Sequence, residues 1–216
     1  PIMIAGGLGS ITSKHTFKRK VKPGTKIIVL GGPGYLIGLG GGSASSAQAG
    51  SSDESLDYAS VQRSNPEMQR RCQEVINLCS LKKNKNPILF IHDVGAGGLS
   101  NAIPELAKDC HLGANIDLRK IPLADNSMSA LEIWSNESQE RYVLAVEKNS
   151  LKEFKEYCVR EKCPYAVVGT LTSKKIFKLR DSKNGKSPIN LPMETIFGYQ
   201  EENIHEIISD VKPNNF

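Results

Sequence analysis

Short apolar runs recur along this chain, and they predict buried strands. Each run is only three to five residues long, which suits a strand better than a helix. β-branched and aromatic side chains are frequent in these runs, as is typical of strands. The six or seven strands expected cover, in chain order, residues 26–30, 88–91, 115–118, 142–146, 165–169, 175–179 and 189–191.

Apolar residues at helical spacing predict four helices between and after these strands. The first begins at Pro66, because proline suits the first helical position, and Ser64 or Asn65 caps it. Its apolar stripe continues to Cys79. The second helix is expected at about residues 99–108.

Proline and capping residues mark the remaining helix boundaries. Pro104 falls inside the second helix and indicates either a first-turn position or a kink. Ser150 and Glu153 have the spacing of a capping box, which predicts the start of the third helix. Pro192 opens a short fourth helix that extends to Phe197.

Both helical crossovers and hairpin turns connect the expected strands. The chain is therefore predicted to form a mixed β-sheet flanked by helices, which belongs to the α+β class. No linker or internal repeat divides the sequence. Residues 1–198 are expected to form a single domain, and residues 199–216 a polar tail.

Residues 88–101 place an acid where ligands are commonly bound. The strand is followed by His92 and Asp93, then by three glycines within four positions, and then by the helix from Leu99. This order puts the Asp93 carboxylate at the carboxyl end of a strand, where open α/β sheets bind ligands. Glycine allows close backbone approach, and a helix N-terminus favours anions. The simpler alternative is a tight turn that merely needs glycine.

Two glycine-rich segments follow the first strand, at residues 31–34 and 38–46. The second resembles a dinucleotide-binding fingerprint, but Ser43 occupies its last glycine position, and no acid follows clearly about 20 residues later. We therefore expect a loop that faces a polar ligand or packs against the Asp93 turn. Its candidate residues are Gly40, Gly41, Gly42 and Ser43.

A dense polar segment at residues 137–141 leads into the buried strand at 142–146. Loops that are held by a rigid strand carry ligand contacts more often than helix faces do. The segment is therefore a second candidate for the binding site.

The composition is that of an ordinary soluble protein, with 39% hydrophobic and 24% charged residues. No apolar run reaches about 18 residues, so no membrane span is expected. The net charge of +5 is too small to indicate a nucleic-acid partner. Residues 1–30 hold six basic residues and no acid, which fits a solvated hairpin face better than a phosphate-binding patch.

The five cysteines show no metal-binding spacing, and their odd number leaves at least one outside any disulfide. Reduced thiols and a cytoplasmic location are the simplest interpretation. The sequence begins without methionine and inside an apolar stretch, so we expect a piece of a longer chain.

Four segments in order carry a family resemblance. They are IIVLGGPGYLIGLGGGSASS (27–46), LDYASVQRSNPEMQRRCQEVI (56–76), PILFIHDVGAGGLSNAIPEL (87–106) and LEIWSNESQERYVLAV (131–146). Together they resemble phosphoribosylformylglycinamidine synthase of the large, single-chain type. The resemblance covers residues 1 to about 198.

The resemblance implies a ligase of de novo purine biosynthesis. This family makes formylglycinamidine ribonucleotide from formylglycinamide ribonucleotide, glutamine and ATP. ATP phosphorylates the amide oxygen, and ammonia from a glutaminase domain displaces the phosphate. The chain is similar to the C-terminal domain of the first of two synthetase-like halves. Its expected partners are the substrate and the remaining synthetase and glutaminase domains, and we expect no nucleic acid or membrane.

The resemblance also implies roles for individual residues. Gln62 of the SVQR motif and the run Glu137, Ser138 and Gln139 match substrate-binding positions, and Asp93 matches a Mg²⁺ ligand. ATP is expected to bind mainly to domains absent from this chain. The resemblance implies no catalytic residue here, so the isolated chain is expected to be inactive. The resemblance assigns no role to His92, for which a core position or a supporting contact to a neighbouring residue is favoured over a catalytic base.

Three alternatives remain open. A relative that phosphorylates another oxygen, such as aminoimidazole ribonucleotide synthetase or selenophosphate synthetase, would share the fold. A non-catalytic scaffold around an auxiliary nucleotide site would keep the family but tolerate changes at Glu137 and Gln139. A nicotinamide-binding module would depend on the glycine loop.

Overall fold

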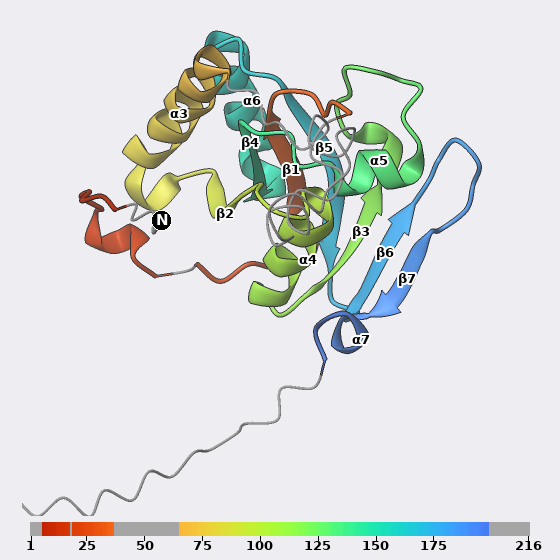
Figure 1. Ribbon diagram of the computed structural model, residues 1–216. Coiled ribbons are helices and arrows are strands. Elements are labelled where there is room, and N and C mark those ends of the chain that lie inside the picture. The colour runs from red at the N-terminus through yellow and green to blue at the C-terminus, as the bar shows by residue number, and fades with distance from the viewer. Residues whose placement is uncertain (1–5, 18, 37–64, 199–216) are drawn as a thin grey trace, which may run out of the picture.

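The computed structural model describes residues 6–17, 19–36 and 65–198. One sheet contains the strands β1 (Lys26–Gly31), β2 (Ile88–Asp93), β3 (Gly113–Asp117), β4 (Arg141–Val146), β5 (Tyr165–Thr172), β6 (Ile176–Arg180) and β7 (Ile189–Pro192). The helices are α3 (Pro66–Leu81), α4 (Leu99–Asp109), α5 (Ala130–Ser135), α6 (Leu151–Arg160) and α7 (Met193–Phe197) (Figure 1). Each expected strand and each of the four expected helices is therefore present.

The strand order is β2-β4-β1-β5-β3-β6-β7. Neighbouring strands are antiparallel except β3 and β6, which are parallel. The predicted mixed sheet of an α+β fold is thus confirmed. β1 lies near the centre of the sheet, between β4 and β5.

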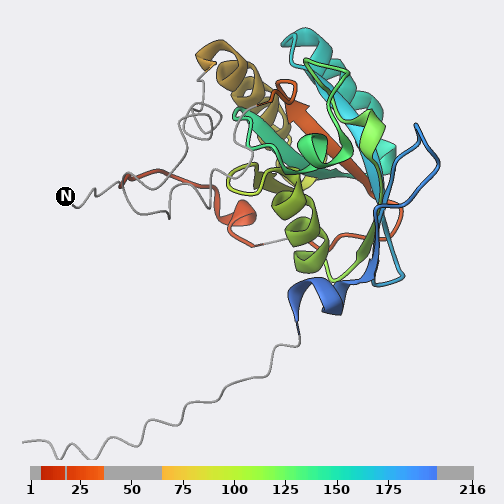
Figure 2. The ribbon, with the colours of Figure 1, turned by 45° about the vertical axis from the view of Figure 1, so that its right-hand side comes forward.

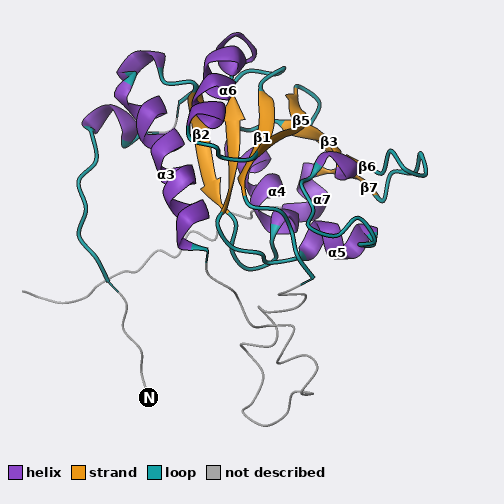
Figure 3. Ribbon diagram, turned by 90° about the horizontal axis from the view of Figure 1, so that it is seen from above, coloured by secondary structure: helices purple, strands orange, loops and turns teal. Residues whose placement is uncertain are grey.

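The continuous apolar runs exist because the central strands are covered on both faces. Ile27 and Val29 of β1 belong to one core cluster, with α4 and α5, whereas Ile28 and Leu30 belong to a second cluster, with α3 and α6. Because side chains alternate across a strand, every residue from Ile27 to Leu30 is buried. Seen from above, α3 and α6 lie on one side of the sheet and α4 and α5 on the other (Figure 3).

The outer part of the sheet is covered on one face only. Phe177 and Leu179 of β6 join the α4/α5 core, whereas Ile176, Lys178 and Arg180 are exposed. This strand therefore alternates between apolar and polar residues, in contrast to β1. In Figure 2, β6 and β7 (blue) lie at the side of the molecule away from α3, and α7 lies at the start of β6.

Three local predictions were wrong or incomplete. β3 starts at Gly113, and Leu118, expected in the strand, begins a 3₁₀ turn. The expected capping box of Ser150 and Glu153 is not formed, because Ser150 makes no side-chain cap and Glu153 instead binds Lys82 and Tyr157. A true capping box joins Ser129 to Glu132 at the start of α5, a helix that the periodicity did not predict.

Two further details settle alternatives that the sequence left open. Asn65 caps α3, since its Oδ1 accepts a hydrogen bond of 3.1 Å from the Met68 amide. Pro104 lies in the middle of α4 and is buried, so it is not a first-turn residue.

Apart from a single 3₁₀ turn (Ser13–His15), the described residues before β1 contain no regular element, so the hairpin face suggested there is absent from them.

A salt bridge fixes the outer strands at their carboxyl ends. Arg119 donates two hydrogen bonds, of 2.8 and 2.9 Å, to the carboxylate of Asp181, which is 1% exposed. The Arg119 guanidinium lowers the pKa of the Asp181 carboxyl to about 2. The stabilisation from this pair is therefore fully present above the ordinary aspartate pKa and is lost as the pH falls toward 2.

None of the five cysteines is in a disulfide. Burial raises the pKa of the Cys79 thiol to about 12 and also raises the pKa of Cys158. Both side chains belong to the core between the sheet and helices α3 and α6. They are neutral packing residues, as the helical spacing of the cysteines in α3 suggested.

Phe177 connects the half-covered part of the sheet to the helices beneath it. It is fully buried, and its ring centroid lies 5.9 Å from that of Trp134. Replacing it with alanine should leave a cavity and lower the free energy of unfolding by about 3–5 kcal/mol in chemical denaturation. The matched control Phe17→Ala, at a side chain that is 82% exposed, should change it by less than about 0.5 kcal/mol. Equal losses for the two variants would contradict this packing role.

Candidate functional site

The pairing of β4 brings three separated segments to one edge of the sheet. β4 is antiparallel to β2 on one side and to β1 on the other. The carboxyl ends of β1 and β2 therefore lie beside the residues that enter β4 (Figure 1). At this edge Asp93 pairs with Tyr142, and Gly31 pairs with Arg141.

Asp93 ends β2, as predicted, and its side chain is 82% exposed. Across the described part of the chain, no cluster of three histidine, cysteine, aspartate or glutamate residues could enclose a metal ion. An exposed carboxylate nevertheless fits the way Mg²⁺ binds, since this ion is commonly held by one or two carboxylates, waters and phosphate oxygens. Asp93 is thus suited to contribute one ligand to a shared Mg²⁺ site.

The segment before β4 is joined directly to the glycine turn after Asp93. Glu137 is 4% exposed, and its Oε1 accepts a hydrogen bond of 2.7 Å from the Gly97 amide. The Oγ of Ser138, which is 1% exposed, accepts a hydrogen bond of 2.9 Å from the Tyr35 amide beyond β1. One short segment therefore connects the loops that follow both neighbouring strands.

Glycine is required at two of these contacts. Gly98 has a φ of +60°, and a Cβ there would overlap the carbonyl oxygen of Asn136. Gly31 has a φ of +113°, and a Cβ there would overlap the carbonyl oxygen of Glu140. Gly98 of HDVGAGGL and Gly31 at the end of β1 thus allow backbone to approach the 136–140 segment closely.

Glu140 joins a fourth segment, the start of α3, to the same edge. It has a φ of +56°, an unfavourable conformation for a residue with a side chain, which the surrounding structure must enforce. Its Oε1 accepts a hydrogen bond of 3.0 Å from the Asn65 amide at the start of α3. Strain of this kind is often found at functional sites.

The structure thus brings together four of the predicted site residues. Asp93, Glu137, Ser138 and Gln139 lie at one edge of the sheet. Gln139 is half-buried, and its Nε2 donates a hydrogen bond of 3.0 Å to the Glu137 carbonyl oxygen. The other candidates, Gln62, Gly40, Gly41, Gly42 and Ser43, lie outside the described residues.

His92 contacts both a helix and the end of its own strand. Its Nε2 lies 2.7 Å from Oε2 of Glu105, and its Nδ1 lies 2.6 Å from the Asp93 carbonyl oxygen. The first contact joins β2 to α4, and the second lies at the strand end that carries Asp93. Glu105 was not among the predicted residues, although its place near the middle of α4 could have suggested a contact with the sheet.

Two buried polar residues at this edge were also missed. Asn136 is fully buried, and its side chain donates to the carbonyl oxygens of Glu132 and Ile133 at the end of α5. Arg141 is 2% exposed. A charged residue at the start of an apolar strand was the available signal, since arginine is seldom fully buried without a specific set of partners.

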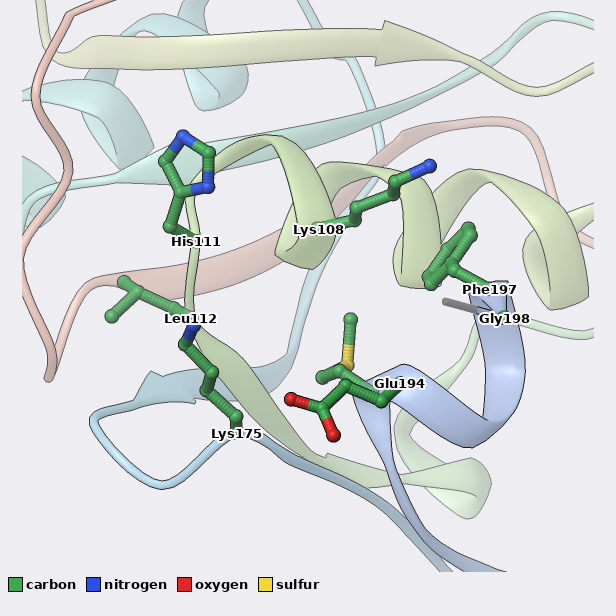
Figure 4. A pocket seen from close by; sticks show the side chains of 8 residues that line it. Lys108, His111, Leu112, Lys175, Glu194, Phe197 and Gly198 are labelled. Carbon is green, nitrogen blue, oxygen red and sulfur yellow. The ribbon is translucent and has the colours of Figure 1, made fainter. Parts of the chain in front are cut away.

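Two cavities lie away from this edge and contain none of the predicted residues. One, of about 240 Å³, lies where α4 ends and β6 begins, and is lined by Lys108, His111, Lys175, Glu194 and neighbours (Figure 4). The cationic groups of this cavity do not converge on one point. The Lys108 ammonium instead lies against the Phe197 ring, 4.6 Å from its centroid. The other, of about 640 Å³, lies between β2, α3 and the segment before β1.

Comparison of the sequence with known proteins identifies relatives over most of its length. A family model described as "AIR synthase related protein, C-terminal domain" matches residues 22–182. A curated phosphoribosylformylglycinamidine synthase from Schizosaccharomyces pombe is 56% identical over 198 residues. The match covers 92% of this chain and 15% of that relative, so this chain spans about 15% of the relative's length.

Solved structures have the same fold. The chain matches "T. maritima PurL complexed with FGAR" with a TM-score of 0.72 and 23% identity, covering 91% of this chain and 31% of that one. It matches "T. maritima PurL complexed with ATP" with a TM-score of 0.65 and 20% identity, covering 91% of this chain and 29% of that one. These matches agree with the α+β fold and its mixed sheet. In the described residues, no helix has both the length and the apolar character needed to span a bilayer.

The contact between Gly98 and Asn136 can be tested against a glycine that shares a positive φ but has free space. Gly185 has a φ of +71°, and nothing lies within 4 Å of the point that a Cβ would occupy there. Both Gly98→Ala and Gly185→Ala place a Cβ on backbone with positive φ, but only Gly98→Ala also forces backbone apart, and the ψ of −141° at Gly98 suits glycine alone. Gly98→Ala should therefore lower the free energy of unfolding by about 1–3 kcal/mol more than Gly185→Ala in urea denaturation. Equal losses would contradict the close approach.

Proposed function

Because this chain belongs to the AIR synthase related protein, C-terminal domain family, we propose that it is one domain of a larger phosphoribosylformylglycinamidine synthase. The larger enzyme converts formylglycinamide ribonucleotide, glutamine and ATP to formylglycinamidine ribonucleotide, ADP, phosphate and glutamate. In this proposal the chain supplies one wall of the substrate cleft and is inactive alone. The 56% identity to the Schizosaccharomyces pombe relative supports this interpretation.

The observation that carries the proposal is the joined edge at the end of β2 and the start of β4. The Glu137–Gly97 hydrogen bond holds the predicted substrate segment beside the turn of the predicted Mg²⁺ ligand Asp93. A phosphoryl transfer from ATP to an amide oxygen needs the two reactants held together, with metal at the phosphate oxygens. A single edge that presents both functions suits such a reaction.

Individual roles follow from exposure. Asp93, with its exposed carboxylate, would hold Mg²⁺, which would neutralise charge on the transferred phosphate when bound. Gln139 is the residue of the 137–139 run that is half-buried and not fully buried, and its amide suits the neutral formamide or ribose groups of the substrate. Glu137 and Ser138 hold the neighbouring loops in the ligand-free chain and would complete the site with Gln62.

One observation favours a second candidate, a scaffold domain around an auxiliary nucleotide site. The side chains of Glu137 and Ser138 are almost fully buried and already contact protein groups. In that case the segment would stabilise the domain, and the chemistry would take place in the other synthetase half. Substitution of Gln139 separates the two candidates.

Gln139→Ala in the full-length enzyme should lower kcat/KM for formylglycinamide ribonucleotide about tenfold or more, because the site loses an amide hydrogen bond. The assay varies this substrate at saturating ATP and ammonia, so the glutaminase step does not limit the rate. Gln73→Ala, at an exposed glutamine of α3, is the matched control and should behave as wild type. An unchanged kcat/KM in folded Gln139→Ala protein would favour the scaffold.

Asp93→Asn should raise the Mg²⁺ concentration needed for half-maximal activity by about tenfold or more, because an amide oxygen is a weaker ligand than a carboxylate. A titration with Mg²⁺ at fixed ATP measures this. Asp109→Asn, at an exposed aspartate at the other end of α4, should leave the titration unchanged. Identical Mg²⁺ dependence of the two variants would remove Asp93 from the metal site.

A further inference from the structure

Arg141 lies at the centre of the candidate site edge but has no role in the proposal so far. It is the first residue of β4 and pairs with Gly31 of β1. Its carbonyl oxygen accepts a hydrogen bond of 3.2 Å from the Val94 amide, just beyond β2. The residue is 2% exposed, so its guanidinium is enclosed by protein.

The guanidinium binds neutral oxygens of the segment that precedes it. Nε donates a hydrogen bond of 2.8 Å to the Ser138 carbonyl oxygen, and Nη2 donates to the carbonyl oxygen and Oδ1 of Asn136, at 2.8 and 3.0 Å. These oxygens lie on both sides of Glu137 in the chain. A single planar group therefore fixes the conformation of the 136–138 turn from inside.

Within residues 6–17, 19–36 and 65–198, no acid neutralises the charge of Arg141. No carboxylate forms a salt bridge with it among the described residues, and its buried Nη1 has no hydrogen-bond partner. Burial lowers its pKa to about 10, so it remains charged at neutral pH. Arg119 is the contrast, because its guanidinium forms a two-bond salt bridge with Asp181 far from this edge.

Burying a cation without a counter-charge is unfavourable, so it needs a compensating benefit. The 136–138 turn suggests the benefit, since it also carries the contacts from Glu137 to the Gly97 amide and from Ser138 to the Tyr35 amide. Both loops depend on the position of this turn. A turn that is ordered before the ligand arrives lowers the entropic cost of binding.

We propose that Arg141 is a positioning residue that pre-orders the 136–138 turn, and with it the Gly97 and Tyr35 loops, for binding of formylglycinamide ribonucleotide. This inference rests on the proposed function of the domain. Arg141 itself does not touch the substrate, because its guanidinium is enclosed. It acts through the residues that it holds.

The kinetic test uses Arg141→Lys in the full-length enzyme. Lysine keeps the positive charge but cannot present the planar fork that binds Ser138 and Asn136 together. KM for formylglycinamide ribonucleotide should rise about tenfold or more, whereas KM for ATP should change less than about twofold. Arg160→Lys, at an exposed arginine of α6, is the matched control and should leave both constants unchanged.

A second measurement, hydrogen exchange of the ligand-free protein, does not depend on activity. Peptides that contain the Gly97 and Tyr35 amides should be protected in the wild-type enzyme and exchange about tenfold faster in Arg141→Lys. A peptide that contains Leu144, in the centre of β4, should be equally protected in both proteins. Faster exchange at the Gly97 and Tyr35 amides, with unchanged exchange at Leu144, would separate loss of the turn from a general loss of stability.

The outcomes distinguish this inference from the proposed function. A wild-type KM in Arg141→Lys, together with an impaired Gln139→Ala, would overturn the role of Arg141 alone. Wild-type behaviour of both variants would overturn the proposed function. If Arg141→Lys does not fold, hydrogen exchange of the wild-type enzyme tests the inference. Free exchange of its Gly97 and Tyr35 amides would show that the turn is not pre-ordered.

Discussion

The antiparallel pairing of β4 with both β2 and β1 is the constraint on which the candidate site depends. Because β4 runs opposite to its two neighbours, the residues that enter it lie beside the ends of both. The contacts of the 136–141 segment with Gly31, Tyr35 and Gly97 all follow from that direction. The strands themselves are held by two apolar cores, one on each face. The polar residues at this edge are therefore held by a rigid, well-packed part of the sheet.

The two parts of the sheet differ in how charge is accommodated. In the outer part, Arg119 and Asp181 neutralise each other, and the exposed face of β6 carries solvated basic side chains. In the central part, Arg141 is buried, and its partners in the described part of the chain are all neutral oxygens. The Arg119–Asp181 pair neutralises both charges and joins the ends of two neighbouring strands. A buried cation bound to loop carbonyl oxygens is better explained by the shape that it gives to the loop.

The sequence was most informative where burial alone decides structure. Continuous apolar runs such as that of β1 marked buried strands, and the acid after β2 was correctly placed at a strand end. Capping was less predictable, because Ser150 with Glu153 and Ser129 with Glu132 have identical spacing. They differ because Ser150 ends a 3₁₀ turn with helical backbone angles, whereas Ser129 is extended, and because Glu153 binds Lys82 and, one turn along its own helix, Tyr157. For Arg141 the sequence offered one signal, a charge at the start of an apolar strand, but the partners that enclose its guanidinium, like the hydrogen bond from the Gly97 amide to Glu137, depend on the tertiary fold.

Ser138 binds the loop after β1 through the main chain of that loop. Ser138 accepts a hydrogen bond from the Tyr35 amide, whereas the Tyr35 side chain is 47% exposed. Every amino acid except proline can supply that amide. Position 35 can therefore vary among homologues while its backbone stays fixed, so its structural importance would be invisible in an alignment. In a library of substitutions the same position should accept any side chain and reject only the imino acid.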